Sequence, residues 1–381
     1  MRQIIALLLA ILFAFGGAVP GAWAKEPARP EISLNEAIAK ALAQSERVKK
    51  AEKEVDRTEA LRDYAADQLD YTPVMPAGNP MIEAAWAELL AADLTWQSSK
   101  KNLTAEQDAV ALDACKKYWD VLQAQEKVKA AEAALASARR QLQNARAGYQ
   151  AGTLPLAALI GAEAQYRRAE AALVSARNDL DKAYTALNQA IGLWPEDRPV
   201  LTTSLEFHPL EVSSLDYEVT KVLENCPQVW LAEQGVRLKQ YYQDIMFYKG
   251  IVYGTFSYKP YEARKVEVEQ AELDAASTKK LFDLITRQLY YSVKSLEEAY
   301  AGAQEGVRAA EEALRVARLK LDVGMATAAD VAAAEQALAD AKKAAFELAC
   351  QHAYMKLAFG KPWAYLSSLS SSSSAGTGAA G

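Results

Sequence analysis

The chain has 381 residues, with 49 Asp and Glu against 43 Lys and Arg and a formal net charge of −6. This mildly acidic and interspersed charge argues against nucleic acid as a partner. The two histidines, and the widely spaced Cys115, Cys226 and Cys350, show no spacing typical of a metal site, a disulfide framework or a nucleophilic catalytic system. We therefore expect no metal and no cofactor, and an enzyme is the least supported class.

The N-terminal segment 1–24, "MRQIIALLLAILFAFGGAVPGAWA", has a basic residue, an apolar run and a small-x-small ending before Lys25. This is the pattern of a cleaved secretory signal peptide. The apolar run is interrupted by Gly16, Gly17 and Pro20, so it is a poor match to a membrane-spanning helix. An uncleaved anchor is the alternative. We expect an exported protein.

A first long helical hairpin is predicted around the segment "YQAGTLPLAALIGAEAQ" at 149–165. Before it, large residues and alanines alternate in the 3-4 spacing of a coiled-coil seam. After Gly152, Thr153 and Pro155 the spacing resumes, so the two helices must run antiparallel. Arms of about 40–50 residues would give a rod of about 60–75 Å. The seam residues are Val121, Ala124, Val128, Ala131, Leu135, Ala138, Leu142, Ala145 and Tyr149, then Leu159, Ala162, Tyr166, Ala169, Leu173, Ala176, Leu180, Ala183, Leu187 and Ala190.

The same pattern recurs in the second half of the chain, where Gly324 corresponds to Gly152. The opening segment "SLNEAIAKAL" from Ser33 matches "SLDYEVTKVL" from Ser214 at a larger offset, so the second copy is shorter before its hairpin. Such a duplication predicts a repeat architecture. The second seam runs through Val293, Leu296, Tyr300, Ala303, Val307, Ala310, Leu314, Ala317 and Leu321, then Val331, Ala334, Leu338, Ala341, Ala345 and Leu348. The expected organisation is a signal peptide at 1–24, a first repeat at 25–194, a linker at 195–213, a second repeat at 214–365 and a disordered Ser/Gly-rich tail at 366–381.

The expected fold class is predominantly all-α, with duplicated long antiparallel hairpins forming a coiled-coil rod and little β-structure. His352 occupies a seam position that corresponds to Leu180. A histidine there indicates that the last helix loosens or faces solvent, and it is not expected to be a ligand.

The order of these segments resembles the TolC family of outer-membrane efflux proteins over roughly residues 31–365. The resemblance rests on "LNEAIAKAL", on "ARAGYQAGTLPLAALIGAEAQ" and "ARLKLDVGMATAADVAAAEQAL" at the two corners, and on "LNQAIG" and "MKLAFG" at the ends of the copies. It implies a homotrimer whose hairpins form an α-helical tunnel and whose short strand pairs contribute to a shared β-barrel in the outer membrane. It also implies that the corners meet a periplasmic adaptor protein and an inner-membrane pump.

The resemblance makes Gly152, Gly324, Arg146 and Arg318 candidate docking residues at the hairpin tips. The alternative is that the glycines are ordinary helix C-caps, and that the arginines are cations favoured by a helix C-terminus. Asp330 falls where the family often has a carboxylate at the tunnel constriction, and three copies would form an acidic ring. Alternatively, it is an aspartate favoured at a helix N-terminus.

The segments that should supply the membrane strands, 71–96 and 250–263, are short of the length that two spanning strands need. The resemblance is therefore to a family member with abbreviated strands, and we expect at most one short strand or hairpin per copy, opposite the corners. Tyr253, Phe256 and Tyr258 are candidate membrane-end aromatics, so membrane contact is an expectation.

The leading hypothesis is a passive conduit component of a tripartite efflux or secretion system, located in the outer membrane or periplasm. The alternative is a structural coiled-coil protein of the cell envelope without a pore. A lipid-binding amphipathic protein is less favoured, because the alanine seams are narrower than lipid-binding faces.

Overall fold

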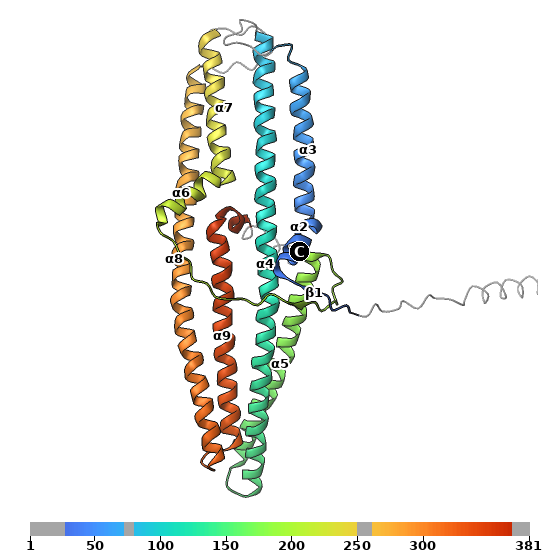
Figure 1. Cartoon of the computed structure of the whole chain (residues 1–381), viewed down its shortest axis with the longest axis vertical. Helices are drawn as coiled ribbons and strands as arrows, with labels where there is room; N and C mark the ends of the chain where they lie inside the picture. The colour runs from blue at the N-terminus through green and yellow to red at the C-terminus, as the bar shows by residue number, and fades with distance from the viewer. Residues whose placement is uncertain (1–26, 72–79, 250–260, 368–381) are drawn as a thin grey trace, which may run out of the picture.

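The computed structural model of the protein describes residues 27–71, 80–249 and 261–367. Within these ranges the chain is an elongated bundle of α-helices (Figure 1), which confirms the predicted all-α class. The elements are β1 (Glu31–Ile32), α2 (Leu34–Gln44), α3 (Glu46–Asp67), α4 (Pro80–Gln150), α5 (Leu156–Ile191), β2 (Val200–Leu201), α6 (Leu215–Asn225), α7 (Pro227–Lys249), α8 (Tyr261–Asp322) and α9 (Ala328–Gly360).

Two very long helices, α4 and α8, run along most of the rod. They have 71 and 62 residues, which at 1.5 Å per residue give about 105 and about 93 Å. Each packs against a shorter helix in either half, α3 and α5 beside α4, and α7 and α9 beside α8 (Figure 1). Both long helices exceed the arm length expected from the sequence, so that expectation was wrong. Helix α4 continues back to Pro80 because 81–96 is rich in Ala, Leu and Glu, which are strong helix formers.

The heptad seams pack the hairpins as predicted. Every predicted seam residue is buried or half-buried, except Tyr149 and Leu321 beside the corners. In the first hairpin, Val121 is fully buried, and Leu173 and Leu187 pack from the returning helix. Small alanines such as Ala138 and Ala176 are also buried, and they allow the two backbones to approach closely.

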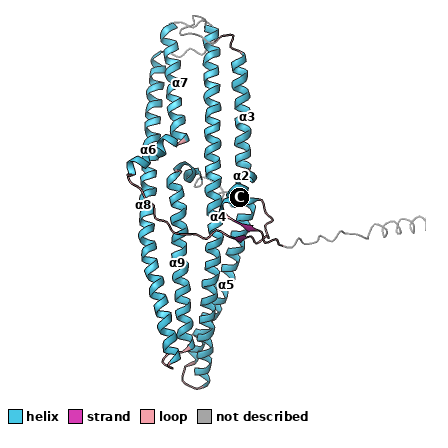
Figure 2. Ribbon diagram, viewed as in Figure 1, coloured by secondary structure: helices cyan, strands magenta, loops and turns pink. Residues whose placement is uncertain are grey.

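A parallel two-residue strand pair, β1 with β2, lies near the middle of the rod (Figure 2). These are the only strands in the part of the chain that the structure describes. Sequence analysis did not predict them, because two-residue strands leave no periodic pattern. They lie beside α2 and α5. Residues 72–79 and 250–260, which belong to the segments where short strands were expected at the end opposite the corners, lie outside the described residues.

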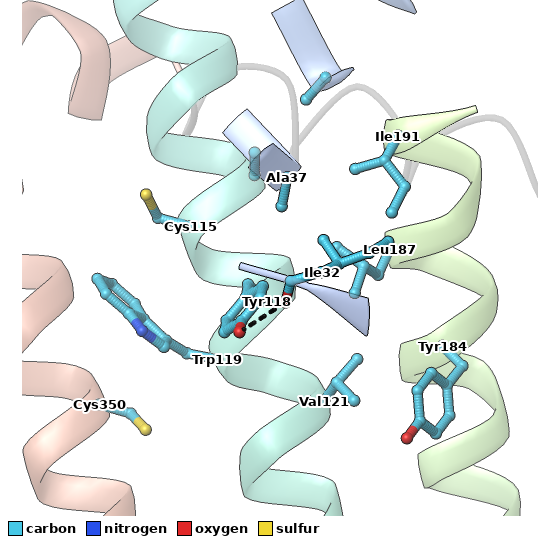
Figure 3. Close-up of a cluster of buried hydrophobic side chains, with 12 residues drawn as sticks. Ile32, Ala37, Cys115, Tyr118, Trp119, Val121, Tyr184, Leu187, Ile191 and Cys350 are labelled. Carbon is cyan, nitrogen blue, oxygen red and sulfur yellow. Dashed lines mark hydrogen bonds between the residues drawn. The ribbon is translucent and has the colours of Figure 1, made fainter. Parts of the chain in front are cut away.

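The side chain of Tyr118, on α4, ties this strand pair to the bundle (Figure 3). It is fully buried. Its hydroxyl donates to the Ile32 carbonyl at 3.2 Å and accepts from the Thr203 amide at 3.0 Å. Ile32, Leu187 and Ile191 pack around it in one apolar cluster. The N-terminal segment and the inter-repeat linker are therefore fixed to the same point of α4.

The linker then crosses α9 and α8 before it reaches α6 (Figure 1). The Phe207 ring stacks on the Tyr300 ring at a centroid separation of 4.0 Å and contacts the His352 ring at 4.5 Å. The Leu210 amide donates to Glu297 Oε1 at 2.6 Å, and the Leu210 carbonyl accepts from Lys294 Nζ at 2.8 Å. The linker is thus fastened to both helices of the second hairpin.

His352 corrects the sequence interpretation. Its side chain is 2% exposed and lies 3.4 Å from Glu297 Oε1, so the helix neither loosens nor turns this residue to solvent. Burial lowers the pKa of the His352 imidazole, although Glu297 opposes that shift. The linker segment around Phe207 packs on His352. This seam position is therefore covered by a segment that lies outside the two helices of the hairpin.

The C-terminal part of the chain also departs from expectation. A helical turn at 362–367 packs Trp363 against α4, α6 and α8, so residues 366 and 367 belong to ordered structure and only 368–381 lie outside the described residues. Asp108 accepts from Lys361 and, at 3.0 Å, from Trp363 Nε1. The predicted signal peptide, residues 1–24, also lies outside the described residues. Among the helices that are described, none has an apolar stretch long enough to cross a membrane.

Candidate functional site: the two hairpin corners

Both hairpins turn at the same end of the rod, where α4 meets α5 and α8 meets α9 (Figure 1). Gly152 and Gly324 both have a φ of +72°. Only glycine adopts this left-handed conformation without steric cost. A Cβ at either position would meet nothing within 4 Å, so the backbone conformation, and not the available space, requires glycine.

The hydrogen bonds of the two corners correspond one to one. In the first corner the amides of Thr153 and Leu154 both donate to the Gly148 carbonyl, at 2.8 and 3.1 Å. In the second, the amides of Met325 and Ala326 donate to the Lys320 carbonyl, at 2.7 and 3.1 Å. Both corners therefore end the long helix in the manner of a Schellman motif, which satisfies otherwise orphaned carbonyls.

Each predicted arginine pairs with a glutamate on the other helix of its own hairpin, just before the corner. Arg146 Nη2 lies 3.2 Å from Glu163 Oε1, and Arg318 Nη2 lies 3.0 Å from Glu335 Oε1. All four side chains are well exposed, so each pair adds little stability. Each arginine therefore has a carboxylate partner in its own chain. Its side chain remains accessible at the rim of the corner because it is more than half exposed.

The two corners differ at the start of the returning helix. Helix α5 begins after Pro155 without a side-chain cap, whereas α9 begins with a capping box. The Asp330 carboxylate accepts from the Thr327 amide at 2.7 Å and from the Thr327 hydroxyl at 2.8 Å. The hydrogen bonds from Thr327 hold the pKa of Asp330 below its usual range. Asp330 is therefore an ionised, exposed carboxylate that caps α9.

Exposed apolar residues surround both corners, and sequence analysis did not single them out. Leu156 and Ile160 are 53% and 56% exposed, and Val323 and Met325 are 69% and 78% exposed. Contiguous exposed apolar surface is typical of an interaction site. The available signal was the apolar Val323 and Met325 in a tight turn, where polar residues are usual.

Shallow grooves continue from the corners between the paired helices. The groove of the first hairpin has a volume of about 550 Å³ and is lined by Arg139, Arg146, Ile160, Glu163 and Arg167, among others. The corresponding groove of the second hairpin has a volume of about 260 Å³ and includes Glu311 and Arg318. The first groove is therefore larger than the second. Its charged lining has three arginines and one glutamate, whereas that of the second has Arg315, Arg318 and Glu311.

Tyr253, Phe256 and Tyr258 lie outside the described residues. Within 27–71, 80–249 and 261–367, no group of His, Cys, Asp and Glu could hold a metal ion. Cys115, Cys226 and Cys350 are free and buried. Burial raises the pKa of the Cys115 thiol to about 11 and that of Cys350 to about 12. Such thiols are poor nucleophiles at neutral pH.

The fold defines a class of protein built from paired helical hairpins with both tips at one end. The model of the family described as outer membrane efflux protein matches residues 79–193. No curated protein matches the sequence closely enough to count as a relative.

Several solved outer-membrane proteins share the fold. The CusC channel is 12% identical with a TM-score of 0.66, and the match covers 88% of this chain and 94% of CusC. The CmeC outer membrane channel of Campylobacter jejuni is 15% identical with a TM-score of 0.65, covering 89% and 90%. VceC of Vibrio cholerae is 17% identical with a TM-score of 0.59, covering 87% and 95%.

Residues 79–193 are therefore similar to the outer membrane efflux protein family, and the described chain as a whole has the fold of these solved channels. The family consists of channel proteins and not of known enzymes.

Proposed function

We propose that this protein is the outer conduit of a tripartite export system, a passive channel that a trimer of the chain encloses. The observation that carries the proposal is the pair of matched corners at one end of a rod about 105 Å long, by the length of α4. A rod of this length can bridge a wide part of the periplasm. The two tips present exposed apolar side chains as a surface for a partner protein.

One chain cannot enclose a passage, because its helices form a row with two uncovered edges. Helix α5 packs against α4 and α2, and α8 packs against α9, α7 and α6. The two helices lie at opposite sides of the rod (Figure 1). A closed wall requires further copies, which supports a ring. By family resemblance we propose three.

The corners are the proposed docking sites for a periplasmic adaptor and, through it, an inner-membrane pump. Gly152 and Gly324 would fix the shape of each tip, and Arg146 and Arg318 would offer cations beside it. Asp330 is proposed to line the narrow end of the tunnel, where three copies would place three carboxylates. The duplication boundaries proposed above, at 25–194 and 214–365, assign one corner to each copy.

Complementation of a strain that lacks the chain tests this proposal. Efflux of a fluorescent dye is measured with wild type, with Met325→Glu, and with Leu273→Glu as a matched control on a similarly exposed side chain of α8, 71% exposed, far from the corners. We expect Met325→Glu to reduce efflux at normal protein level and Leu273→Glu to leave it near wild type. Normal efflux with Met325→Glu and with Val323→Glu would contradict the docking assignment.

The same experiment separates the conduit from a structural envelope protein without a pore. A conduit predicts that removing the chain abolishes dye efflux while envelope integrity is retained. A structural protein predicts leakage of periplasmic contents with unchanged active efflux.

A further inference from the structure

An open cavity lies where α4, α8 and α9 come together, at the level of the strand pair. Its volume is about 970 Å³, which is large enough for a small-molecule ligand. Its lining residues all belong to these three helices, and α9 packs against both of the others. None of the residues assigned to the hairpin corners contributes to the lining. The cavity is therefore a separate feature, and it is complete within one chain.

The cavity opens on the face of these helices that is opposite the linker. On each helix, a residue that contacts the linker or the strand pair is two positions from a residue that lines the cavity. Two positions of an α-helix are about 200° apart around its axis, so the two sets point in opposite directions. The pairs are Tyr118 and Asp120 on α4, Lys294 and Ser292 on α8, and His352 and Tyr354 on α9.

Aromatic and apolar side chains form much of the lining. Trp119 reaches from α4 toward α9 (Figure 3), and Tyr354 adds a second ring from α9. On α8, Tyr291 and Leu284 also line the cavity, although they are 63% and 62% exposed. Large apolar groups that stay open beside aromatic rings suit the apolar body of a ligand.

The charged residues of the lining differ in whether they have partners. Arg287 is held by Asp216 at 2.6 Å and by Asp283 at 3.1 Å. Among the residues that the structure describes, the side chains of Asp120 and Lys116 have no ion pair and no hydrogen bond. The cavity therefore contains one carboxylate and one ammonium group whose charges are not matched by a close contact.

The sequence explains why Asp120 has no partner on its own helix. An acid that precedes a lysine by four positions forms a better pair than the reverse order. On α4, Asp113 precedes Lys117, and the two are bridged at 2.6 Å. Lys116 precedes Asp120, and its ammonium lies 5.9 Å from the centre of the Tyr354 ring instead.

The surroundings of Asp120 favour an added cation. The residue is half-buried, and this burial raises the pKa of its carboxyl, although the nearby charge of Lys116 opposes that shift. An ionised carboxylate that is partly removed from water is costly unless a cation or hydrogen-bond donor contacts it. A ligand with a cationic group would supply that contact.

We propose that this cavity binds an amphipathic organic cation, with its cationic group beside Asp120 and its apolar body against Trp119 and Tyr291. Aromatic ring faces also attract cations, so the rings and the carboxylate select the same chemistry. Lys116 is exposed on a flexible stem and can move aside when the ligand enters.

The orientation of the cavity ties this site to the proposed conduit. In a ring, one face of the wall lines the passage and the other face lies outside. A passage on the linker side would be obstructed by the linker of every copy, so the cavity side faces inward. This placement rests on the proposed function, whereas binding of a cation to the chain does not.

Titration of the purified full-length protein with ethidium, an aromatic cation whose fluorescence rises in apolar surroundings, tests the site. Asp120→Asn should weaken binding by about tenfold or more, because the amide has the same shape but no charge. Tyr291→Ala changes an exposed ring and should weaken binding by roughly fivefold. Asp274→Asn is the matched control, since Asp274 is an exposed carboxylate of α8 outside the cavity, and this change should leave binding unaltered.

Lys116→Gln tests which charge anchors the ligand. Ethidium should bind this variant as well as the wild type or more tightly, because a like charge has been removed. Anilinonaphthalene sulfonate, an aromatic anion, should bind the wild type more weakly than ethidium does. Weaker ethidium binding by Lys116→Gln, tighter binding of the anion, or unchanged ethidium binding by both Asp120→Asn and Tyr291→Ala would overturn the site.

Efflux measurements separate the site from the conduit. In the complemented strain, Asp120→Asn should lower efflux of ethidium relative to that of N-phenylnaphthylamine, a neutral aromatic dye, because the wall attracts cations less. Ethidium binding that depends on Asp120, with an unchanged efflux ratio, would overturn the placement in the passage. A wild type that restores efflux but binds no ethidium would overturn the site and leave the conduit standing. A wild type that binds ethidium but restores efflux of neither dye would overturn the conduit and leave the binding site.

Discussion

Replacing Tyr118 by Phe tests how the linker is attached to the rod. The substitution removes only the hydroxyl, so the buried ring still fills its place among Ile32, Leu187 and Ile191. Two hydrogen bonds are lost, but their consequences differ. The Ile32 carbonyl still accepts from the Thr202 amide at 3.1 Å, so it stays satisfied.

The Thr203 amide loses its bond to Tyr118, and it lies in a half-buried part of the linker. Leaving one such donor without a partner costs about 1–2 kcal/mol, so the free energy of unfolding should fall by about that amount. The urea midpoint should move down with an unchanged slope, because the surface exposed on unfolding is the same. Hydrogen exchange at the Thr203 amide should accelerate by about tenfold or more.

Tyr184→Phe is the matched control. The Tyr184 hydroxyl accepts from Gln125 Nε2 at 2.8 Å, and Gln125 is only half-buried, so water can replace the lost partner. Its effect should be the smaller of the two. Equal stability of the Tyr118 variant and wild type, with unchanged exchange at Thr203, would refute the view that Tyr118 anchors the linker.

Three further outcomes are expected. Gly324→Val forces a β-branched residue into a φ of +72° and should destabilise the second corner by about 1–2 kcal/mol; an unchanged melting temperature would contradict the strain. The thiols of Cys115 and Cys350, with pKa values raised to about 11 and about 12 by burial, should react with iodoacetamide at pH 8 only after unfolding, and rapid labelling of the folded chain would contradict their burial. The pKa of Asp330 is lowered, so its cap stabilises α9 fully at pH values above the usual pKa of a carboxyl group. That stabilisation is lost as the pH falls through the lowered pKa. The chemical shift of the Thr327 amide should follow the titration of Asp330, and this pH dependence should disappear in Asp330→Asn. An amide shift that stays constant as the pH is lowered would contradict the cap.

The hairpins could be predicted because their information is local and periodic. A seam residue every three or four positions specifies which face of a helix is covered, and Gly152 and Gly324 mark the turns where a left-handed residue is needed. The pairing of Arg146 with Glu163 is also a local consequence of the corner, since both residues flank it in the chain.

The connections between the copies could not be predicted in the same way. The strand pair joins residues 31–32 to 200–201, and it depends on a single tyrosine of α4 rather than on any pattern. His352 was misjudged because its partner ring, Phe207, comes from the linker and not from the neighbouring helix. The extension of α4 to Pro80 was missed because strands were expected from the family resemblance, although the local composition favoured a helix.

The central claim is that several copies of this rod enclose a passage. Electron microscopy of the purified full-length oligomer, averaged in end-on views, tests it most directly. The account predicts a hollow cylinder with three-fold symmetry, its wall formed by alternating first and second hairpins and its tips at one end. A solid rod, or a single chain without a central channel, would contradict it.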